Sequence, residues 1–147
     1  LSAIDFSTLP LKDAITIVRG NGKRKLAVFE DPNCGYCKRF RKTLADTKDI
    51  TVYTFLYPIL SDDSRAKVKN VLCSSDKAKA WDDWMVNGKT PAAAPEACNP
   101  NASVDKVVDL GKKLKVTGTP TIFFTDGSRV PGAIDAKTLE SRLASIK

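Results

Sequence analysis

One stretch of the sequence decides the fold, Leu26-Ala27-Val28-Phe29-Glu30-Asp31-Pro32-Asn33-Cys34-Gly35-Tyr36-Cys37. It opens with apolar residues that predict a short buried strand, and Asp31-Pro32-Asn33 ends that strand. Asn33 is a favourable helix N-cap, so we expect a helix to begin at Cys34, with Cys37 one turn later on the same face. The stretch therefore predicts a strand, a turn and a helix whose first turn carries two cysteines.

The position of these two cysteines indicates redox chemistry. Backbone N–H groups and the positive end of the helix dipole stabilise a thiolate at a helix N-terminus, and the thiolate is the nucleophilic form. Cys37 is close enough to Cys34 to close a disulfide with it. Positive side chains follow at Lys38, Arg39 and Arg41 and could add to the stabilisation. The sequence thus predicts a reversible redox pair, with half of a zinc site or an inert structural disulfide as the alternatives.

Composition predicts one globular domain over residues 1–147. The chain of 147 residues is 42% hydrophobic and 28% charged, and a chain of this length buries roughly two-thirds of its unfolded surface. No apolar run reaches the roughly 18 to 20 residues that span a bilayer. The net charge is +7, but lysine and arginine are scattered without interleaved aromatic residues, which favours a solvated basic surface and no nucleic-acid partner. The absence of histidine excludes Ser-His and Cys-His nucleophile pairs and most catalytic zinc sites.

The two remaining cysteines, Cys73 and Cys98, are far apart in the sequence. Cys73 ends a helical stretch, and Cys98 lies in a Pro/Ala-rich segment at 89–102. A bridge between them would pin a long irregular loop to a helix end and would indicate an oxidising compartment. The rival interpretation is a zinc site made of all four cysteines, whose usual pattern is two close pairs, whereas only one pair is close here.

Hydrophobic periodicity predicts an α/β chain in the order β-β-α-β-α-α-α-β-β-α. We expect strands at 14–19, 26–30, 50–57, 121–125 and 128–130, and helices at 34–45, 62–72, between Ser75 and Gly88, at 104–114 and after Asp135, with caps at Ser61, Ser75, Ser103 and Asp135. The dipeptide Asn21-Gly22 predicts that the first two strands form a hairpin. The pattern therefore predicts a central mixed sheet with helices on its faces, an N-terminal hairpin and a helical insertion at about 62–114.

Several segments together resemble a known family. They are Phe29-Glu30-Asp31 before Cys34-Gly35-Tyr36-Cys37, the pair Cys73 and Cys98, Val116-Thr117-Gly118-Thr119-Pro120, and the hairpin Thr125-Asp126-Gly127-Ser128 leading to Val130-Pro131-Gly132. A Cys-X-X-Cys at the start of the first main helix, followed much later by Thr-Pro opening a hairpin, resembles the thioredoxin fold. The combination, which covers nearly the whole chain, more closely resembles the catalytic domain of the DsbC/DsbG family of bacterial periplasmic thiol:disulfide interchange proteins.

This resemblance implies a role for individual residues. Cys34 would attack a disulfide and Cys37 would resolve the mixed disulfide. Pro120 would be cis, and Thr119 would face the cysteine pair and offer backbone groups to an extended substrate. The other implied residues are Gly35, Tyr36 and Asp31 around the active cysteines and Cys73 and Cys98 as a structural disulfide, with no metal and no cofactor beyond the redox-active disulfide.

The resemblance also implies a function, a place and partners. It implies exchange or isomerisation of disulfides in the bacterial periplasm, with misfolded or cysteine-containing secreted proteins as substrates and a membrane thiol reductase of the DsbD type as partner. Family members carry an N-terminal dimerisation domain that a linker joins to the catalytic domain, and residues 1–11 could be a remnant of that linker. A homodimer is therefore expected only if the natural protein has such a domain and this sequence lacks it. The main alternative is a monomeric dithiol oxidase or reductase without isomerase activity.

Two further expectations concern acids and aromatic residues. Thioredoxin carries a buried acid where this chain has Val28, so Glu30 or Asp31 could serve as proton acceptor, although a solvated carboxylate is the favoured interpretation. The aromatic residues Trp81, Trp84 and Tyr57 could line an apolar substrate surface, but the helical spacing of the two tryptophans favours core positions for them. A zinc-stabilised binding module and a holdase chaperone with an incidental redox motif remain as functions of another class.

Overall fold

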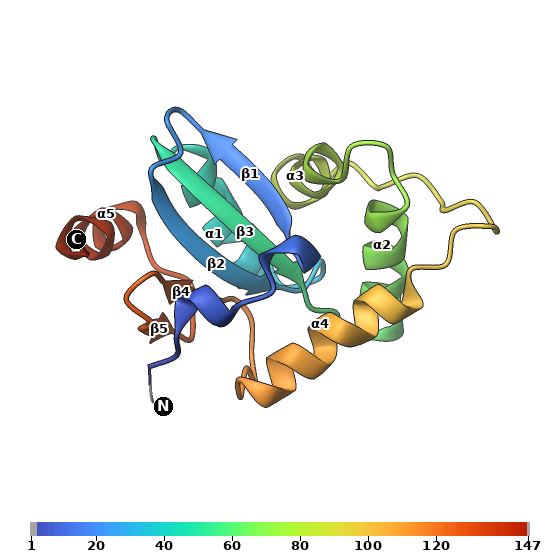
Figure 1. Ribbon diagram of the computed structural model, residues 1–147. Coiled ribbons are helices and arrows are strands. Elements are labelled where there is room, and N and C mark those ends of the chain that lie inside the picture. Colours follow the sequence, from blue (N-terminus) through green and yellow to red (C-terminus); the bar gives the residue numbers. More distant parts are fainter. Residues whose placement is uncertain (1–2, 147) are drawn as a thin grey trace.

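The structure, a computed structural model, describes residues 3–146 and folds them into a five-stranded sheet with helices on both faces (Figure 1). The strands are β1 (Ile15–Arg19), β2 (Arg24–Glu30), β3 (Ile50–Leu56), β4 (Thr121–Phe124) and β5 (Arg129–Val130). The helices are α1 (Gly35–Ala45), α2 (Asp62–Leu72), α3 (Lys77–Asn87), α4 (Asn101–Lys113) and α5 (Ala136–Ser145), and two short 3-10 helices, Phe6–Thr8 and Leu11–Asp13, precede β1. The predicted order of elements is confirmed, while residues 1 and 2 of the predicted linker remnant lie outside the described residues.

The strand order is β1-β3-β2-β4-β5, so the predicted N-terminal hairpin is wrong. The chain does turn at residues 20–22, but β1 then pairs antiparallel with β3, and β3 pairs in parallel with β2. The burial pattern gives the reason. Strand β3 is buried on both faces and therefore belongs in the middle of the sheet, whereas β1 alternates between buried and exposed residues, as an edge strand does. The predicted hairpin of β4 and β5 is confirmed.

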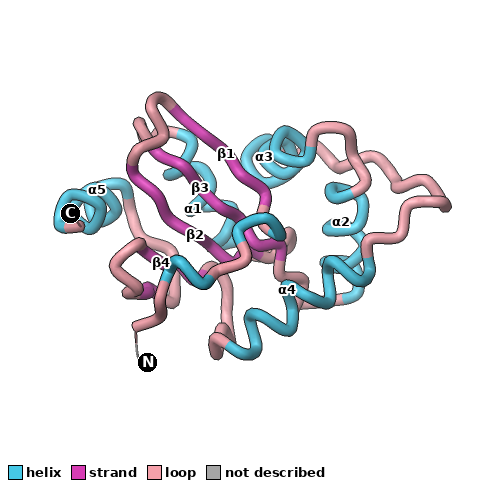
Figure 2. The backbone as a smooth tube through the Cα atoms, in the orientation of Figure 1, coloured by secondary structure: helices cyan, strands magenta, loops and turns pink. Residues whose placement is uncertain are grey.

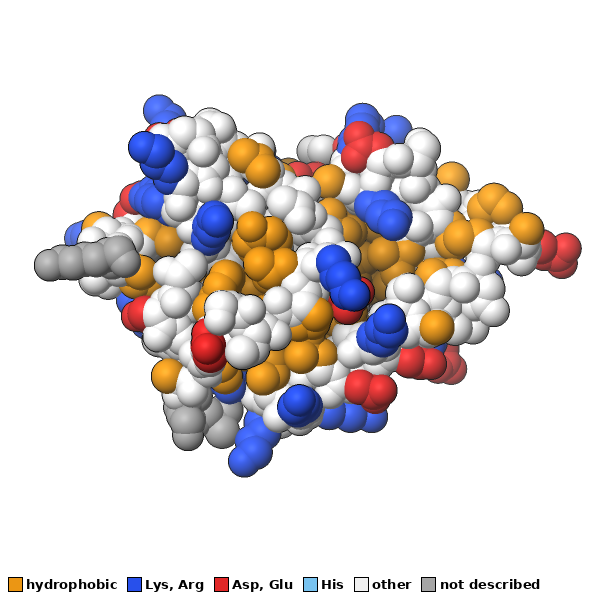
Figure 3. Space-filling model, in the orientation of Figure 1, with side chains coloured by type: hydrophobic (Ala, Val, Ile, Leu, Met, Phe, Trp, Pro, Cys, Tyr) orange, Lys and Arg blue, Asp and Glu red, His pale blue; other side chains and the backbone are white. Residues whose placement is uncertain are grey.

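Each face of the sheet has its own hydrophobic cluster. Helices α1 and α5 cover one face, with Phe40, Leu44, Leu139 and Leu143 packed on apolar residues of β2, β3 and β4. On the other face, which Figure 1 turns toward the viewer, Phe6 and Val107 pack on Phe29, Phe55 and Phe123. Figure 3 shows apolar side chains at the centre of this face, with basic side chains scattered around them.

Helices α2, α3 and α4 form the predicted insertion between β3 and β4, and Figure 2 shows the long loop that joins the last two. The insertion packs a third cluster, including Val68, Trp81 and Val104, against both cysteines of the CxxC motif. The motif therefore lies where the insertion meets the sheet.

The helix caps test the local predictions. The predicted caps Ser61 and Asp135 are confirmed, because each accepts a hydrogen bond from a backbone N–H in the first turn of its helix. Asp76 rather than Ser75 caps α3, and α4 begins at Asn101, before the predicted cap Ser103.

Candidate active site

The CxxC motif begins α1, but its cap differs from the predicted one. Cys34, in an extended conformation, is the N-cap, and its Sγ accepts a hydrogen bond from the backbone N–H of Cys37 at 3.2 Å. The predicted cap, Asn33, instead donates its side-chain amide to Asp63 and Ser64 of α2, at 2.9 and 3.0 Å. The sulfur of Cys34 thus takes the place of a capping oxygen and accepts a backbone N–H, an interaction that in general favours the thiolate form of a cysteine.

The two thiols of the motif have different surroundings. Both are unbonded to other sulfur atoms, and Cys34 retains 7% exposure whereas Cys37 has 0%. Burial raises the pKa of the Cys37 thiol well above its ordinary value, and the Glu30 carboxylate raises that pKa further. Cys34 is therefore the thiol that a substrate can reach, and Cys37 lies behind it in neutral form.

The loop that contains Thr119 and Pro120, far from the motif in sequence, contacts Cys34. Its Sγ donates a hydrogen bond to the backbone carbonyl of Thr119 at 3.3 Å, across 85 positions of sequence. The peptide bond between Thr119 and Pro120 is cis, as the resemblance implied, and Pro120 leads directly into β4. The fold thus brings together the CxxC motif and the Thr-Pro dipeptide, as the family resemblance implied. Gly35 and Tyr36 open α1 between the cysteines, and Tyr36 is 62% exposed.

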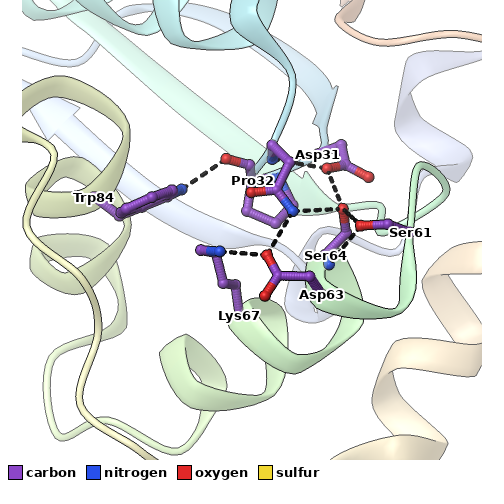
Figure 4. A network of polar contacts seen from close by, with 8 residues as sticks. Asp31, Pro32, Ser61, Asp63, Ser64, Lys67 and Trp84 are labelled. Carbon is purple, nitrogen blue, oxygen red and sulfur yellow. Dashed lines mark hydrogen bonds and ion pairs between the residues drawn. The ribbon is translucent and has the colours of Figure 1, made fainter.

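Asp31 holds the loop before the motif in place. Figure 4 shows its carboxylate among the polar groups of this loop and α2. One oxygen accepts hydrogen bonds from the N–H of Asn33 and the hydroxyl of Ser64, both at 2.8 Å, and the other accepts from the N–H of Leu60 at 2.9 Å. The backbone carbonyl of Asp31 accepts from the N–H of Cys34 at 3.2 Å. Asp31 is therefore a fully buried anchor with three donors on its carboxylate, and the expectation of a solvated acid is wrong for it.

Glu30 is also fully buried, which sequence reasoning missed. One of its oxygens accepts a hydrogen bond from the indole N–H of Trp81 at 3.0 Å and lies 3.5 Å from Nη1 of Arg41. The other oxygen, Oε2, has no hydrogen-bond partner among the described residues. Burial raises the pKa of Glu30, and the charge of Arg41 opposes that rise. Glu30 therefore places a carboxyl oxygen that accepts no hydrogen bond from the described residues near the buried thiol of Cys37.

Arg41 links this acid to the insertion. Its Nε pairs with Asp82 of α3 at 2.9 Å, and its Nη2 donates to the hydroxyl of Thr54 in β3 at 3.0 Å. Arg41 follows Cys37 by one helical turn and is buried. An arginine on the apolar face of α1 is the feature of the sequence that could have indicated a buried acidic partner. Arg41 was predicted to act as a positive charge beside the thiols, but in the structure it pairs with the carboxylates of Glu30 and Asp82.

The other basic and aromatic residues near the motif pack on one another. The ammonium groups of Lys38 and Lys67 lie over the ring of Trp84, and the guanidinium of Arg39 lies over the ring of Tyr36. Trp84 donates its indole N–H to the carbonyl of Pro32 at 2.6 Å, a contact drawn in Figure 4. The prediction of a core position is confirmed for Trp81, whereas Trp84 is half-buried, and Tyr57 is buried rather than exposed to a substrate.

Cys73 and Cys98 form a disulfide between the C-cap of α2 and the loop before α4. A zinc site needs free thiolates, so this bond contradicts the four-cysteine zinc alternative. The part of the chain that the structure describes contains no cluster of His, Cys, Asp or Glu suited to a metal ion. None of the described helices combines the length and apolar character that crossing a membrane requires.

Comparison with known proteins defines the class of this domain. The family of the thioredoxin-like domain matches residues 11–147, which is almost the whole chain. The chain therefore belongs to the thioredoxin-like family, and its mixed sheet, its CxxC motif at the start of α1 and its Thr-Pro loop agree with that assignment.

Within this family, the chain is similar to several disulfide interchange proteins. The crystal structure of a disulfide interchange protein from Neisseria gonorrhoeae is 40% identical, with a TM-score of 0.85 over 93% of this chain and 97% of that one. A probable thiol:disulfide interchange protein DsbC from Bordetella pertussis is 54% identical over 97% of this chain and 50% of its own length, and the DsbC of Escherichia coli is 33% identical over 90% and 56%. The predicted resemblance to DsbC is confirmed, and the chain spans about half the length of these curated relatives.

Proposed function

We propose that this chain is the catalytic domain of a thiol:disulfide interchange protein that exchanges or isomerises disulfides in other proteins. The observation that carries the proposal is the position of the Cys34 sulfur. It caps α1, accepts the N–H of Cys37 and lies against the carbonyl of Thr119, with a second thiol buried directly behind it. This arrangement favours a reachable nucleophile with an internal resolving group.

The reaction follows from the two thiols. The thiolate of Cys34 attacks one sulfur of a substrate disulfide, forms a mixed disulfide and releases the other substrate sulfur as a thiolate. Cys37 then loses its proton and attacks the sulfur of Cys34. The Cys34–Cys37 disulfide forms, the second substrate thiol leaves, and the substrate has gained the two electrons that the motif has lost. The reverse sequence oxidises a substrate dithiol.

Glu30 is the proton acceptor that we assign to Cys37 in the resolving step. It is buried close to that thiol, its Oε2 has no partner among the described residues, and its raised pKa makes it a better base than an ordinary carboxylate. Arg41 holds the other oxygen and so positions the acid. Asp31 is unsuited to this step because donors occupy both of its carboxylate oxygens.

The high pKa of Cys37 also bears on the choice between isomerase and oxidoreductase. Even with Glu30 as its proton acceptor, a resolving thiol with a raised pKa is protonated most of the time and attacks more slowly than a free thiolate, so the mixed disulfide persists and another substrate cysteine has time to attack it. This favours isomerisation over simple dithiol oxidation or reduction, which remains the second candidate.

The setting and partners belong to the same proposal. The disulfide of Cys73 and Cys98 favours an oxidising compartment, and we propose the bacterial periplasm. The substrates would be misfolded or cysteine-containing secreted proteins, and a membrane thiol reductase of the DsbD type would return the motif to the dithiol form. The exposed side chains of Tyr36 and Leu60 offer apolar contacts to an unfolded chain. Tyr36 lies between the two cysteines of the motif, and the backbone N–H of Leu60 is bound to the carboxylate of Asp31.

The test uses the reduced chain and a peptide with one disulfide, with mass spectrometry to follow the products. The wild-type chain should form the Cys34–Cys37 disulfide and release the reduced peptide. Cys37→Ser should accumulate a mixed disulfide on Cys34, whereas Cys34→Ser should give none. A Cys34→Ser variant that still reduces the peptide would overturn the proposal, and unchanged suppression of protein aggregation by the same variant would favour the holdase alternative.

A further inference from the structure

A cavity of about 180 Å³ lies beside the loop that covers Cys34. The loop contributes Gly118 and Thr119, and the β4–β5 side contributes Arg129 and Pro131. One lining residue, Thr119, also contacts the nucleophile, because its carbonyl is 3.3 Å from the sulfur of Cys34. Consecutive residues of an extended peptide are about 3.3 Å apart, so a residue next to the attacked cysteine could reach this cavity.

The charged side chains that line the cavity are both cationic. They are Lys115 and Arg129, and none of the described lining residues is acidic. Four other arginines, at positions 19, 24, 41 and 65, each pair with a carboxylate. Within residues 3–146, no carboxylate forms an ion pair with Lys115 or Arg129. The positive charge at this cavity is therefore unbalanced.

The fold holds the guanidinium of Arg129 in place beside Lys115. Arg129 donates Nη1 to the carbonyl of Leu114 at 2.6 Å, and its guanidinium lies over the ring of Phe123 at 4.6 Å. Partial burial lowers the pKa of Arg129, which reflects a charge that water solvates poorly and that a carboxylate would stabilise. Lys115 is exposed, lies two residues after the end of α4 and adopts a left-handed conformation with φ of 59°.

We propose that this cavity is a subsite for an acidic side chain of the substrate polypeptide, an aspartate or glutamate close to the cysteine that Cys34 attacks. The inference rests on the proposed function and names a substrate class for it. A carboxylate in the cavity would pair with Lys115 and with the guanidinium of Arg129, and would hold the substrate backbone against Thr119. Substrates with acid near the cysteine would then be attacked faster than equivalent basic ones.

The test compares disulfide-linked peptides of one sequence that carry Asp, Asn or Lys one or two positions before or after the cysteine. The reduced full chain is mixed with each peptide, and each rate is divided by the rate with dithiothreitol, because a neighbouring charge alters the reactivity of any disulfide. The wild-type chain should prefer the best Asp peptide over its Lys counterpart by about threefold to tenfold, as expected for partly exposed ion pairs, and added salt should reduce that preference.

Variants assign the preference to the cavity. Lys115→Gln should lower the ratio toward one without abolishing it, because Arg129 remains in the cavity, and Lys115→Glu should lower it further. Lys112→Gln, which removes an equivalent exposed charge from the last turn of α4, should leave the ratio unchanged. Equal normalised rates for the Asp and Lys peptides, or an equal loss of preference in Lys112→Gln, would overturn this inference alone. Failure of the wild-type chain to reduce any peptide would overturn the proposed function and this inference with it.

Discussion

The two pairs of cysteines differ in what surrounds their sulfur atoms. Cys34 and Cys37 lie on one turn of α1, unbonded, with an N–H and a carbonyl directed at the first sulfur. Cys73 and Cys98 are bonded across a sequence separation of 25 and tie α2 to an irregular loop. The first pair can open and close while the chain around it stays in place, whereas opening the second frees a long loop. The comparison teaches that position in the fold separates a catalytic pair from a structural pair.

The largest effect should come from removing the nucleophile of the first pair. Cys34→Ser should lower the rate of disulfide reduction by at least about a thousandfold, because the remaining thiol, Cys37, is buried and protonated. Stopped-flow measurement with a fluorescent disulfide peptide gives this rate. Residual activity within tenfold of wild type would contradict the roles assigned to the two thiols.

Removing the second pair should affect stability and leave catalysis intact. The double variant Cys73→Ser, Cys98→Ser should lose about 3 to 4 kcal/mol of unfolding free energy, since the unfolded chain regains the entropy of the open loop. Urea denaturation measures the loss, and the peptide reduction rate under native conditions should stay within about twofold of wild type. A large loss of rate in a folded double variant would break the comparison.

A substitution at Glu30 tests how the first pair resolves the mixed disulfide. Glu30→Gln should slow resolution of the mixed disulfide by about a hundredfold near neutral pH, because it removes the proton acceptor of Cys37. The defect should shrink as pH rises, since the raised pKa of Cys37 means that its thiolate fraction still increases in alkaline solution. Rapid-quench analysis of the mixed disulfide across pH gives both quantities.

Asp82→Asn is the matched control for that variant. It removes another carboxylate partner of Arg41 at 2.9 Å but leaves Glu30 in place. The resolving step in Asp82→Asn should keep the wild-type pH profile. If both variants slow resolution equally, Glu30 acts only through the structure of the arginine cluster.

Asp31 should give the smallest effect, and one on stability alone. Asp31→Asn keeps the side-chain shape but directs an amide N–H at a donor, either the hydroxyl of Ser64 or the N–H of Leu60. The expected loss is about 1 to 2 kcal/mol of unfolding free energy, measured by urea denaturation. Resolution in this variant should follow the wild-type pH profile, in contrast to Glu30→Gln.

The sequence predicted those features that depend on nearby residues. The caps Ser61 and Asp135 follow from hydrogen bonds within the first helical turn. The CxxC motif at the start of α1 follows from the strand and turn before it. The meeting of this motif with the Thr-Pro loop came from resemblance to a family, because no local signal joins residues 85 positions apart.

Other features depend on partners that are distant in sequence. Asn33 is not the cap of α1 because α2 supplies Asp63 and Ser64 to its side chain. Glu30 is buried because Arg41 and Trp81 reach it from α1 and α3. The N-terminal hairpin fails since β3 occupies the place between β1 and β2. Each of these misses reflects a tertiary contact that a short window of sequence does not contain.

The central claim is that Cys34 is the nucleophile that attacks the substrate disulfide, whereas Cys37 is buried and stays protonated until the resolving step. Differential alkylation of the reduced chain at several pH values, with mass spectrometry to locate the label, tests this most directly. We predict that Cys34 is labelled first at neutral pH, that Cys37 is labelled only at high pH or on unfolding, and that Cys73 and Cys98 remain unlabelled under mild reduction. Labelling of Cys37 before Cys34 at neutral pH would contradict the account.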